Sequence, residues 1–253
     1  MIVDAHAHIS NTEYGNINVL LNCMDESRID KAILVPGGMI DVRRMSNYIL
    51  HKEEPKLTEP PNCLVEEMIK KFPNKFFGFC CINPLNGDNE IEKFKNLIES
   101  GFSGLKLAPT VHKFSLRGKM IYKLAKICEK YQVPFYTHVT YSPAASTSKV
   151  GMLAKEFPDV NFIIGHMGFG PADIEAIEIA GSMENVYLET SGSSFIILKE
   201  AVKEIGVDKL IYGSEFPMYH PAVELKKIKL LDITTKDKEK IFSKNILNIL
   251  PRR

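Results

Sequence analysis

The sequence predicts an α/β protein that folds as a single (β/α)8 barrel, the TIM-barrel architecture, and three observations carry this prediction. The chain has 253 residues, close to the roughly 250 typical of such a barrel. Short runs rich in apolar and β-branched residues alternate with longer segments of helical period, as parallel strands joined by crossover helices would. Eight such runs occur, which is the number that closes a barrel.

The predicted strands are mostly apolar on both faces, as parallel strands covered by helices on one side and by a barrel interior on the other should be. In chain order they are IVDAHAHI from Ile2, KAILVPG from Lys31, FFGFCCIN from Phe76, GFSGLKLAP from Gly101, VPFYTHVT from Val133, NFIIGHMG from Asn161, NVYLETSG from Asn185 and KLIYGSEFP from Lys209. The predicted helices between and after them are Glu90–Ser100, Gly118–Tyr131, Val150–Phe157, Pro171–Ala180, Ser194–Gly206 and Lys236–Leu250.

The longest departure from this alternation lies between the second and third strands. Residues 38–75 are too many for a simple βα loop and contain two weak helical patterns separated by EEPKLTEPP. Because long βα loops in barrels usually carry function, we predict one domain over residues 1–253 with 38–75 as a partly irregular cap over the barrel mouth. His51, within this insertion, is predicted to be a surface residue.

The composition favours a small-molecule partner. The 32 basic and 31 acidic residues are mixed along the chain and give a formal net charge of +1, so no broad footprint for nucleic acid or an anionic membrane is present. No apolar stretch approaches the roughly 18 to 20 residues of a membrane helix. The five cysteines lack CxxC spacing and no signal peptide precedes the first strand. We therefore expect a soluble protein of the reducing cytoplasm.

Polar residues interrupt the predicted strands near their ends, where a buried strand tolerates them only if they are paired or coordinated. His6 and His8 are two apart, so the strand period directs both imidazoles to one face. A lone histidine of this kind is more often a core residue. Equivalent positions on the fifth, sixth and eighth strands, however, hold His138, His166 and Glu215. The pattern therefore predicts convergence of all five side chains at the mouth.

Neutral imidazole and carboxylate groups together suit zinc or a similar first-row ion. Three or four such ligands with one open position would form a catalytic site, in which a divalent ion lowers the pKa of water or polarises a carbonyl. We predict one divalent metal ion, with Zn²⁺ our first choice and manganese and iron left open. His166 or Glu215 would supply the adjacent acid or base. The glycines around His166 lack dinucleotide spacing, so no nucleotide cofactor is predicted.

These motifs resemble the metal-dependent amidohydrolase superfamily, in the amidohydrolase-related branch that includes aminocarboxymuconate-semialdehyde decarboxylase and related carboxylyases and hydrolases. VDAHAHIS resembles the family's HxH strand, YTHV its strand-five histidine, IIGHMG its strand-six histidine and YGSEFP its closing strand. The resemblance implies that His6, His8 and His138 ligate the metal, that His166 acts near the water or substrate, and that the strand-eight acid completes the site. The family often forms dimers, so a homodimer stays open.

Two residues leave alternatives. The family usually has aspartate where this chain has Glu215, whose additional methylene moves the carboxylate outward by about a bond length. Glu215 is expected first as a metal ligand, second as a proton carrier only, and third as a sign of drift from the family chemistry. Lys106, on the fourth strand, is either a carboxylated bridging lysine, as in the superfamily's two-metal enzymes, or a partner for a substrate carboxylate or a neighbouring acid.

The functional hypothesis is a metal-dependent hydrolase that cleaves an amide, ester or lactone of a small organic acid through metal-activated water. In it His166, Glu215 and Lys106 are the catalytic side chains, and His6, His8, His138 and Glu215 bind the metal. The substrate is then a carboxylic acid derivative. The first alternative is a metal-dependent decarboxylase of a small carboxylic acid, and the second is a binding barrel that has lost its metal chemistry.

Overall fold

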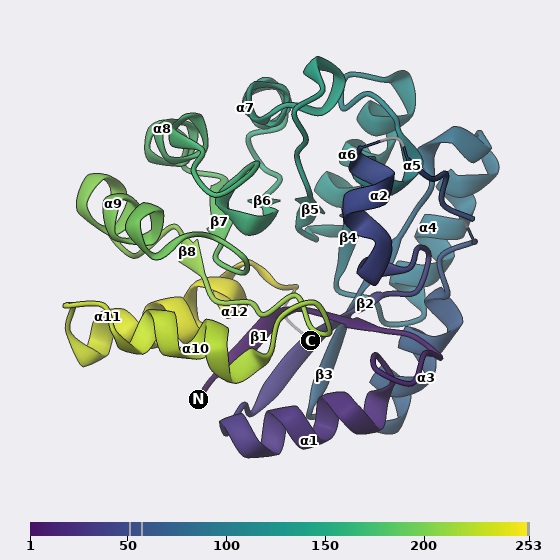
Figure 1. The fold of residues 1–253 in the computed structure, drawn as a ribbon. Helices are drawn as coiled ribbons and strands as arrows, with labels where there is room; N and C mark the ends of the chain where they lie inside the picture. Colours follow the sequence, from purple (N-terminus) through teal and green to yellow (C-terminus); the bar gives the residue numbers. More distant parts are fainter. Residues whose placement is uncertain (51, 57, 252–253) are drawn as a thin grey trace.

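The computed structural model of the protein describes residues 1–50, 52–56 and 58–251, and its centre is a ring of eight parallel strands (Figure 1). The strands follow one another around the ring in chain order. They are β1 (Val3–Ile9), β2 (Lys31–Pro36), β3 (Phe76–Cys81), β4 (Gly104–Leu107), β5 (Phe135–Thr137), β6 (Phe162–Ile164), β7 (Val186–Glu189) and β8 (Leu210–Ile211). Each lies within one of the eight predicted runs.

The ring closes between the first and last strands. The backbone N–H of Ala5 donates to the carbonyl of Tyr212 at 3.0 Å, and that of His8 donates to Phe216 at 2.8 Å. Beyond the end of β8, the N–H of Glu215 donates to the carbonyl of His6 at 2.6 Å. These bonds join β1 to the β8 segment, so the predicted (β/α)8 barrel is confirmed.

Helices alternate with the strands, and most of them surround the ring on its outside (Figure 1). They are α1 (Ile17–Ser27), α2 (Met45–Ile49), α3 (Asn62–Lys71), α4 (Asn89–Glu99), α5 (Pro109–His112), α6 (Lys119–Tyr131), α7 (Thr147–Glu156), α8 (Ile174–Ser182), α9 (Phe195–Ile205), α10 (Pro221–Lys229), α11 (Thr235–Glu239) and α12 (Asn245–Ile249). The helix expected over Lys236–Leu250 is divided, because a π-helical segment, Lys240–Lys244, separates α11 from α12. The pattern of strands and helices did not include α1 or α10.

The insertion between β2 and β3 divides into two parts with different surroundings. Its second helical pattern becomes α3, whose Val65 and Ile69 side chains lie so close to Gly78 of β3 that a Cβ there would meet them at 2.9 and 3.2 Å. Helix α3 is therefore the crossover that covers β2 and β3. The first pattern becomes the short helix α2, which lies inside the outline of the outer helices (Figure 1). His51 lies outside the described residues.

Apolar packing fixes the barrel from inside and outside. Inside the ring, Ile33, Phe79, Ile163 and Ile211 are fully buried and form one cluster with Ile246 of α12. Outward-facing strand residues and the inner faces of the helices form the larger cluster around them. Tight packing of this kind holds the strand ends at fixed positions, which a catalytic site requires.

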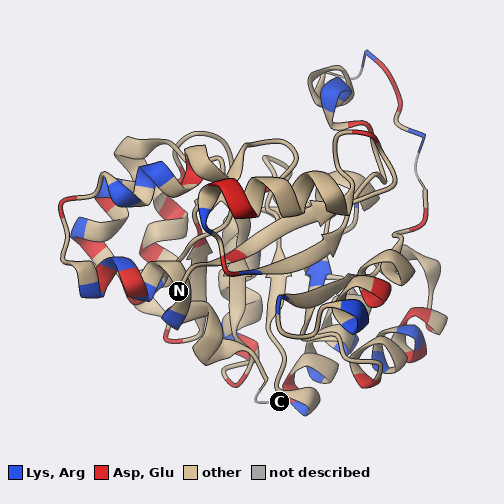
Figure 2. Ribbon diagram, turned by 90° about the horizontal axis from the view of Figure 1, so that it is seen from below, with Lys and Arg blue, Asp and Glu red and all other residues tan. Residues whose placement is uncertain are grey.

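Charged residues occupy the outer helices, where blue and red segments are interspersed (Figure 2). Ion pairs such as Lys203–Glu200 and Lys70–Glu66 connect neighbouring turns of single helices on this surface. Among the described residues, no helix has the length and apolar character needed to cross a bilayer.

Candidate active site and metal centre

All six side chains predicted for the site come from the carboxyl ends of strands or the turns that follow them. His6 and His8 are on β1 and Lys106 is on β4, while His138 directly follows β5. His166 lies in the turn after β6, and Glu215 lies in the loop after β8. The site residues are His6, His8, Lys106, His138, His166 and Glu215. The barrel brings them together at its mouth, where enzymes of this fold place their chemistry.

A bulge in β1 sets the direction of the first two histidines. Asp4 pairs with Ala32 but Ala7 pairs with Leu34, so β1 has one more residue than β2 over this interval. The period-two argument holds within the HxH pair, since the Nε2 atoms of His6 and His8 are 3.0 Å apart. A bulge re-aims side chains beside it and is common next to active sites.

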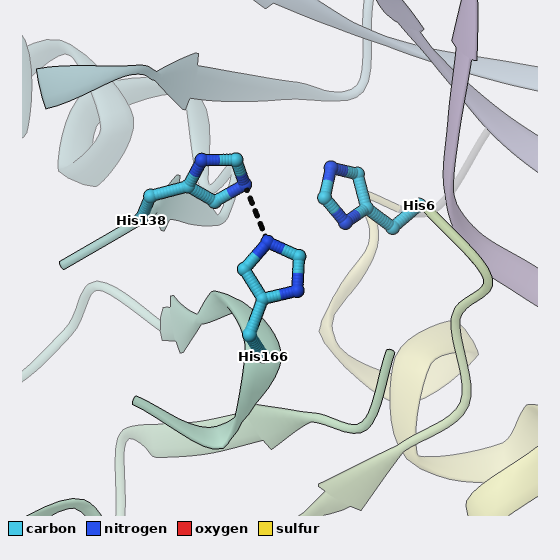
Figure 3. A group of neighbouring side chains, drawn as sticks. All are labelled: His6, His138 and His166. Atoms are coloured by element: carbon cyan, nitrogen blue, oxygen red, sulfur yellow. Dashed lines mark hydrogen bonds between the residues drawn. The ribbon is translucent and has the colours of Figure 1, made fainter. Parts of the chain in front are cut away.

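The ring nitrogens converge on a small volume at the floor of the mouth. His166 Nε2 lies 3.1 Å from His138 Nε2, and Figure 3 shows His6 turned toward the same pair. Two overlapping sets of side chains, His6 with His138 and His166, and His6 with His8 and Glu215, each have ligand atoms within 4.8 Å of one another. His6 belongs to both sets.

The partners of Nδ1 decide which nitrogen of each imidazole is free to bind. His8 Nδ1 lies 3.1 Å from the carbonyl oxygen of Pro36 and must carry its hydrogen to make this bond. His6 Nδ1 lies 3.3 Å from Glu189 Oε2 and 2.8 Å from Tyr136 Oη, and Tyr136 donates its own proton to Glu189 at 2.8 Å. Both histidines therefore turn an Nε2 lone pair toward the centre. Such second contacts fix the tautomer of metal-binding histidines.

Burial also keeps three of these histidines neutral. Loss of hydration lowers the pKa of His6 and of His138 well below the usual value, with the nearby Lys106 ammonium adding to the effect. Burial likewise lowers the pKa of His8 to about 4. Neutral imidazoles with convergent lone pairs, together with the Glu215 carboxylate, are a donor set that fits a divalent first-row ion.

Lys106 occupies the centre of this cluster. Its Nζ donates to His6 Nε2 at 3.0 Å and to His138 Nε2 at 2.7 Å, and it lies 3.6 Å from the centre of the Tyr136 ring. Burial lowers its pKa to about 7. Lys106 thus uses the same lone pairs that a metal ion would use, so an ion held by His6 and His138 must replace these two hydrogen bonds.

His166 and Glu215 form the second functional pair. Glu215 Oε1 is 3.2 Å from His166 Nε2, and His166 Nδ1 donates to the carbonyl of Ser191 at 3.0 Å. Burial alone would lower the pKa of His166, but the adjacent Glu215 carboxylate reverses this and raises it. The additional methylene of Glu215 therefore still allows its carboxylate to reach both His166 and the histidine cluster.

Both members of this pair have a left-handed backbone, with φ of 61° at His166 and 54° at Glu215. Residues other than glycine seldom adopt this conformation, and such strain concentrates at functional sites. Because the rest of the barrel holds these turns in place, the two side chains meet each other above the strand ends.

Glu189, at the end of β7, is a site residue that the sequence pattern did not identify. Its side chain is fully buried and accepts hydrogen bonds from Tyr136 Oη, the backbone N–H of Ser191 at 2.6 Å and that of His166 at 3.3 Å. Together with its contact to His6, these bonds connect the ends of β1, β5, β6 and β7. Glu189 therefore orients the histidines without facing the mouth.

A signal for these supporting residues was present in the sequence. Tyr136 precedes His138 by two positions, so it shares the inward face of β5, and Glu189 is a carboxylate within a run of buried residues. The rule that identified the histidines, that a polar residue in a buried strand must be paired, applies equally to both. Asp4 is a third case, since burial raises its pKa to about 7 and Ser214 Oγ donates to it at 2.5 Å.

Above the floor lies a cavity of about 490 Å³. Its base is formed by His8, His138, His166 and Glu215. Its walls come from helix α2 and from the segments that follow the strands, chiefly those after β1, β2, β4, β6 and β8. The cavity is large enough for a small organic molecule. A molecule bound there would contact the histidines and Glu215 at the base.

A (β/α)8 barrel with histidines and a carboxylate converging at its mouth has the architecture and the donor set of barrel enzymes that use a metal ion. Within that class, a family model described as Amidohydrolase matches residues 3–252. The chain therefore belongs to the amidohydrolase family, and the resemblance of its motifs to that family is confirmed. A search of curated proteins finds no match to this chain.

Solved structures share the fold at low sequence identity. An uncharacterised TIM-barrel protein from Bordetella bronchiseptica has a TM-score of 0.77 at 16% identity, covering 98% of this chain and 97% of its own. A dihydroxybenzoic acid decarboxylase from a Polaromonas species, with bound manganese and the inhibitor 2-nitroresorcinol, has a TM-score of 0.69 at 18% identity, covering 98% and 96%. A probable 2-pyrone-4,6-dicarboxylic acid hydrolase from Acinetobacter baumannii, with citric acid bound, has a TM-score of 0.70 at 15% identity, covering 98% of both chains.

Proposed function

We propose that the protein is a metal-dependent hydrolase that cleaves an amide, ester or lactone of a small organic acid. The observation that carries the proposal is the contact of 3.2 Å between His166 Nε2 and Glu215 Oε1 beside the convergent histidine nitrogens. Hydrolysis needs a group that takes a proton from water and returns it to the leaving atom. A histidine whose Nε2 is free to take that proton, beside a carboxylate that stabilises the protonated imidazole, meets this need.

We assign the metal to His6, His8, His138 and Glu215, with Zn²⁺ as the first candidate because three imidazoles and one carboxylate suit it. When bound, a divalent ion acts as a Lewis acid toward a carbonyl oxygen and lowers the pKa of water. Glu189 and Pro36 hold His6 and His8 in the required tautomers through their Nδ1 atoms. Glu215 accordingly serves both as a ligand and as the partner of His166.

His166 carries the proton in this scheme. The carbonyl of Ser191 holds Nδ1, so only Nε2 faces the cavity floor. This nitrogen accepts a proton from the attacking water while the carbonyl carbon gains its new C–O bond. The same proton passes to the leaving nitrogen or oxygen when the original bond breaks. Lys106 lies among the histidines, and once a metal ion replaces its hydrogen bonds to His6 and His138, its cation is left to stabilise negative charge that develops on the substrate.

Decarboxylation is the second candidate, and Lys106 is the observation that favours it. A buried cation beside His6 and His138 would pair with a substrate carboxylate before carbon dioxide leaves. A solved neighbour of the same fold is a decarboxylase. The two reactions are distinguished by their products, since hydrolysis consumes one water and yields an acid, whereas decarboxylation releases carbon dioxide.

The test is a His166→Asn variant assayed with a panel of esters, lactones, amides and aromatic acids, with both acid and carbon dioxide measured. Asparagine keeps a polar side chain near the floor but cannot carry the proton. We expect unchanged metal content and a fall in turnover of about 100-fold or more. Unchanged turnover with a confirmed substrate would remove His166 from the mechanism. Carbon dioxide as the only product would favour the second candidate.

A further inference from the structure

A second cavity adjoins the one above the histidine cluster. It measures about 310 Å³ and lies between helix α2 and the loops after β4 and β5. Five residues line both cavities, which therefore meet at their side chains. The shared residues are Ile40, Met45, Ile49, Thr110 and Phe169. The two cavities therefore adjoin at these side chains: the first reaches His138 and His166, and the second continues along α2 on the other side of Met45 and Ile49.

Among the described residues that line these cavities, charged side chains lie only at the two ends, Glu215 at the floor and Lys113 at the rim. Among the described residues that line the first cavity there is no lysine or arginine, and its walls are formed largely by side chains such as Met39, Val111, Val139 and Met218. In the second cavity the one lining cation within the described residues is Lys113. Its side chain is 61% exposed and lies 3.5 Å from Glu54, so it faces solvent at the rim.

Two exposed aromatic rings also stand at the outer end of the second cavity. Tyr141 and Phe169 form its rim with ring centres 5.8 Å apart, and they are 65% and 44% exposed. Exposed aromatic rings at the entrance of a cavity favour entry of an apolar group over a charged one. Between the rim and the histidine cluster, the described residues that line the two cavities are therefore uncharged.

This distribution restricts what the site can hold. A carboxylate placed between the floor and the rim would lose hydration without gaining a cation from the described lining residues, which is strongly unfavourable. An alkyl or aryl group in the same position would bury apolar surface against the methionine, isoleucine and phenylalanine side chains, which is favourable. The walls thus select against a second charge and in favour of hydrocarbon.

We infer that the substrate is an ester, amide or lactone whose acyl part is an extended hydrocarbon or aryl group, lying in the cavity beneath α2 while its carbonyl faces the histidine cluster. This inference rests on the proposed hydrolase function and adds the substrate class. Met45 and Ile49, one turn apart on α2 and lining both cavities, determine the acceptable chain length.

The experiment measures binding of straight-chain alkylhydroxamic acids, from two to ten carbons, to the Zn²⁺-loaded protein by isothermal titration calorimetry. The hydroxamate imitates the reacting carbonyl at the metal, and the alkyl chain probes the second cavity. We expect Kd to fall about fourfold for each added methylene until the chain reaches the rim. Turnover of acyl esters of matching lengths should follow the same order.

A Met45→Trp variant tests where the alkyl chain of the hydroxamate lies. The larger side chain fills the boundary between the two cavities, so the gain in affinity with chain length should disappear. Met152→Trp is the matched control, because Met152 is an exposed methionine on α7 that does not line either cavity. This control should retain the full dependence on chain length, and circular dichroism verifies that both variants fold.

The outcomes separate this inference from the proposed function. If acetohydroxamate binds and longer chains bind no better, or if Met45→Trp leaves the length dependence unchanged, the substrate class is wrong and the hydrolase proposal stands. If affinity rises with chain length but no ester, amide or lactone is cleaved, the cavity assignment holds and the reaction is wrong. If no hydroxamate of any length binds, both are overturned.

Discussion

The floor and the wall of the mouth are built on opposite principles. On the floor, His6, His166 and Glu189 are held by several hydrogen bonds each, from strands on different sides of the barrel. On the wall, Met45 and Ile49 stand on a helix of five residues and are only partly covered. The barrel therefore holds the candidate ligands and proton carriers in fixed positions, whereas a short insertion determines the shape of the cavity above them.

The largest effect is expected from the floor, through His6→Ala. His6 belongs to both sets of possible metal ligands, so its removal takes a donor from the centre of the site. We expect metal affinity to fall by more than about 100-fold, beyond the loss typical of an outer partner, and turnover to fall with it. Metal affinity is measured by isothermal titration calorimetry with Zn²⁺. A variant that binds metal as tightly as the parent would show that the floor is not a metal centre.

The second-largest effect on metal affinity is expected from Glu189, which contacts His6 from beneath the floor. Glu189→Gln retains the shape of the side chain but removes the negative charge that holds His6 Nδ1–H and the Tyr136 hydroxyl. We expect metal affinity to fall about 10- to 100-fold, as for other partners of metal-binding histidines. Glu184→Gln, an exposed change near the start of the same strand, is the control and should leave affinity unchanged.

A third prediction concerns the barrel interior that keeps the floor rigid. A Cβ added at Gly104 would lie 2.5 Å from two ring carbons of Phe79, so Gly104→Ala overpacks the interior. We expect the free energy of unfolding to decrease by about 1–3 kcal/mol, measured by urea denaturation. Phe79→Leu in the same chain makes room for the methyl group. If the double variant loses as much unfolding free energy as the two single variants together, the contact with Phe79 is not the cause.

The smallest effect on stability is expected from the wall. Met45→Ala removes a partly covered side chain from α2, so the free energy of unfolding should change by no more than about 0.5 kcal/mol. KM for a long-chain substrate should rise while kcat for a short one stays the same. A loss of stability comparable to that of Gly104→Ala would mean that α2 is part of the core, and the contrast between floor and wall would fail.

The strand order and the gathering of the histidines follow from the sequence because both depend on simple periods. Apolar runs that alternate with helical segments along the chain predicted the position of every strand. The two-residue period of a strand predicted that His6 and His8 share one face. The β1 bulge was not predictable, since it arises from register with β2 rather than from local preference. The same is true of the π-helical segment at Lys240–Lys244.

The part of the site that escaped prediction is the part that depends on tertiary contacts. Glu189 becomes a connecting residue only when β5, β6 and β1 lie beside β7, and Lys106 becomes central only when His6 and His138 approach it from either side. The position of α2 over the mouth depends on packing between the insertion and the strand ends. Residue types thus indicated the chemistry, but not the contacts that orient it.

We propose that one divalent ion binds where these imidazoles converge, and elemental analysis measures this occupancy. Protein purified without added metal and then titrated with Zn²⁺ should contain or bind one equivalent, and removal of that ion by a chelator should lower the midpoint of thermal unfolding. Less than about a tenth of an equivalent, with no binding on titration and no effect of the chelator, would contradict the claim.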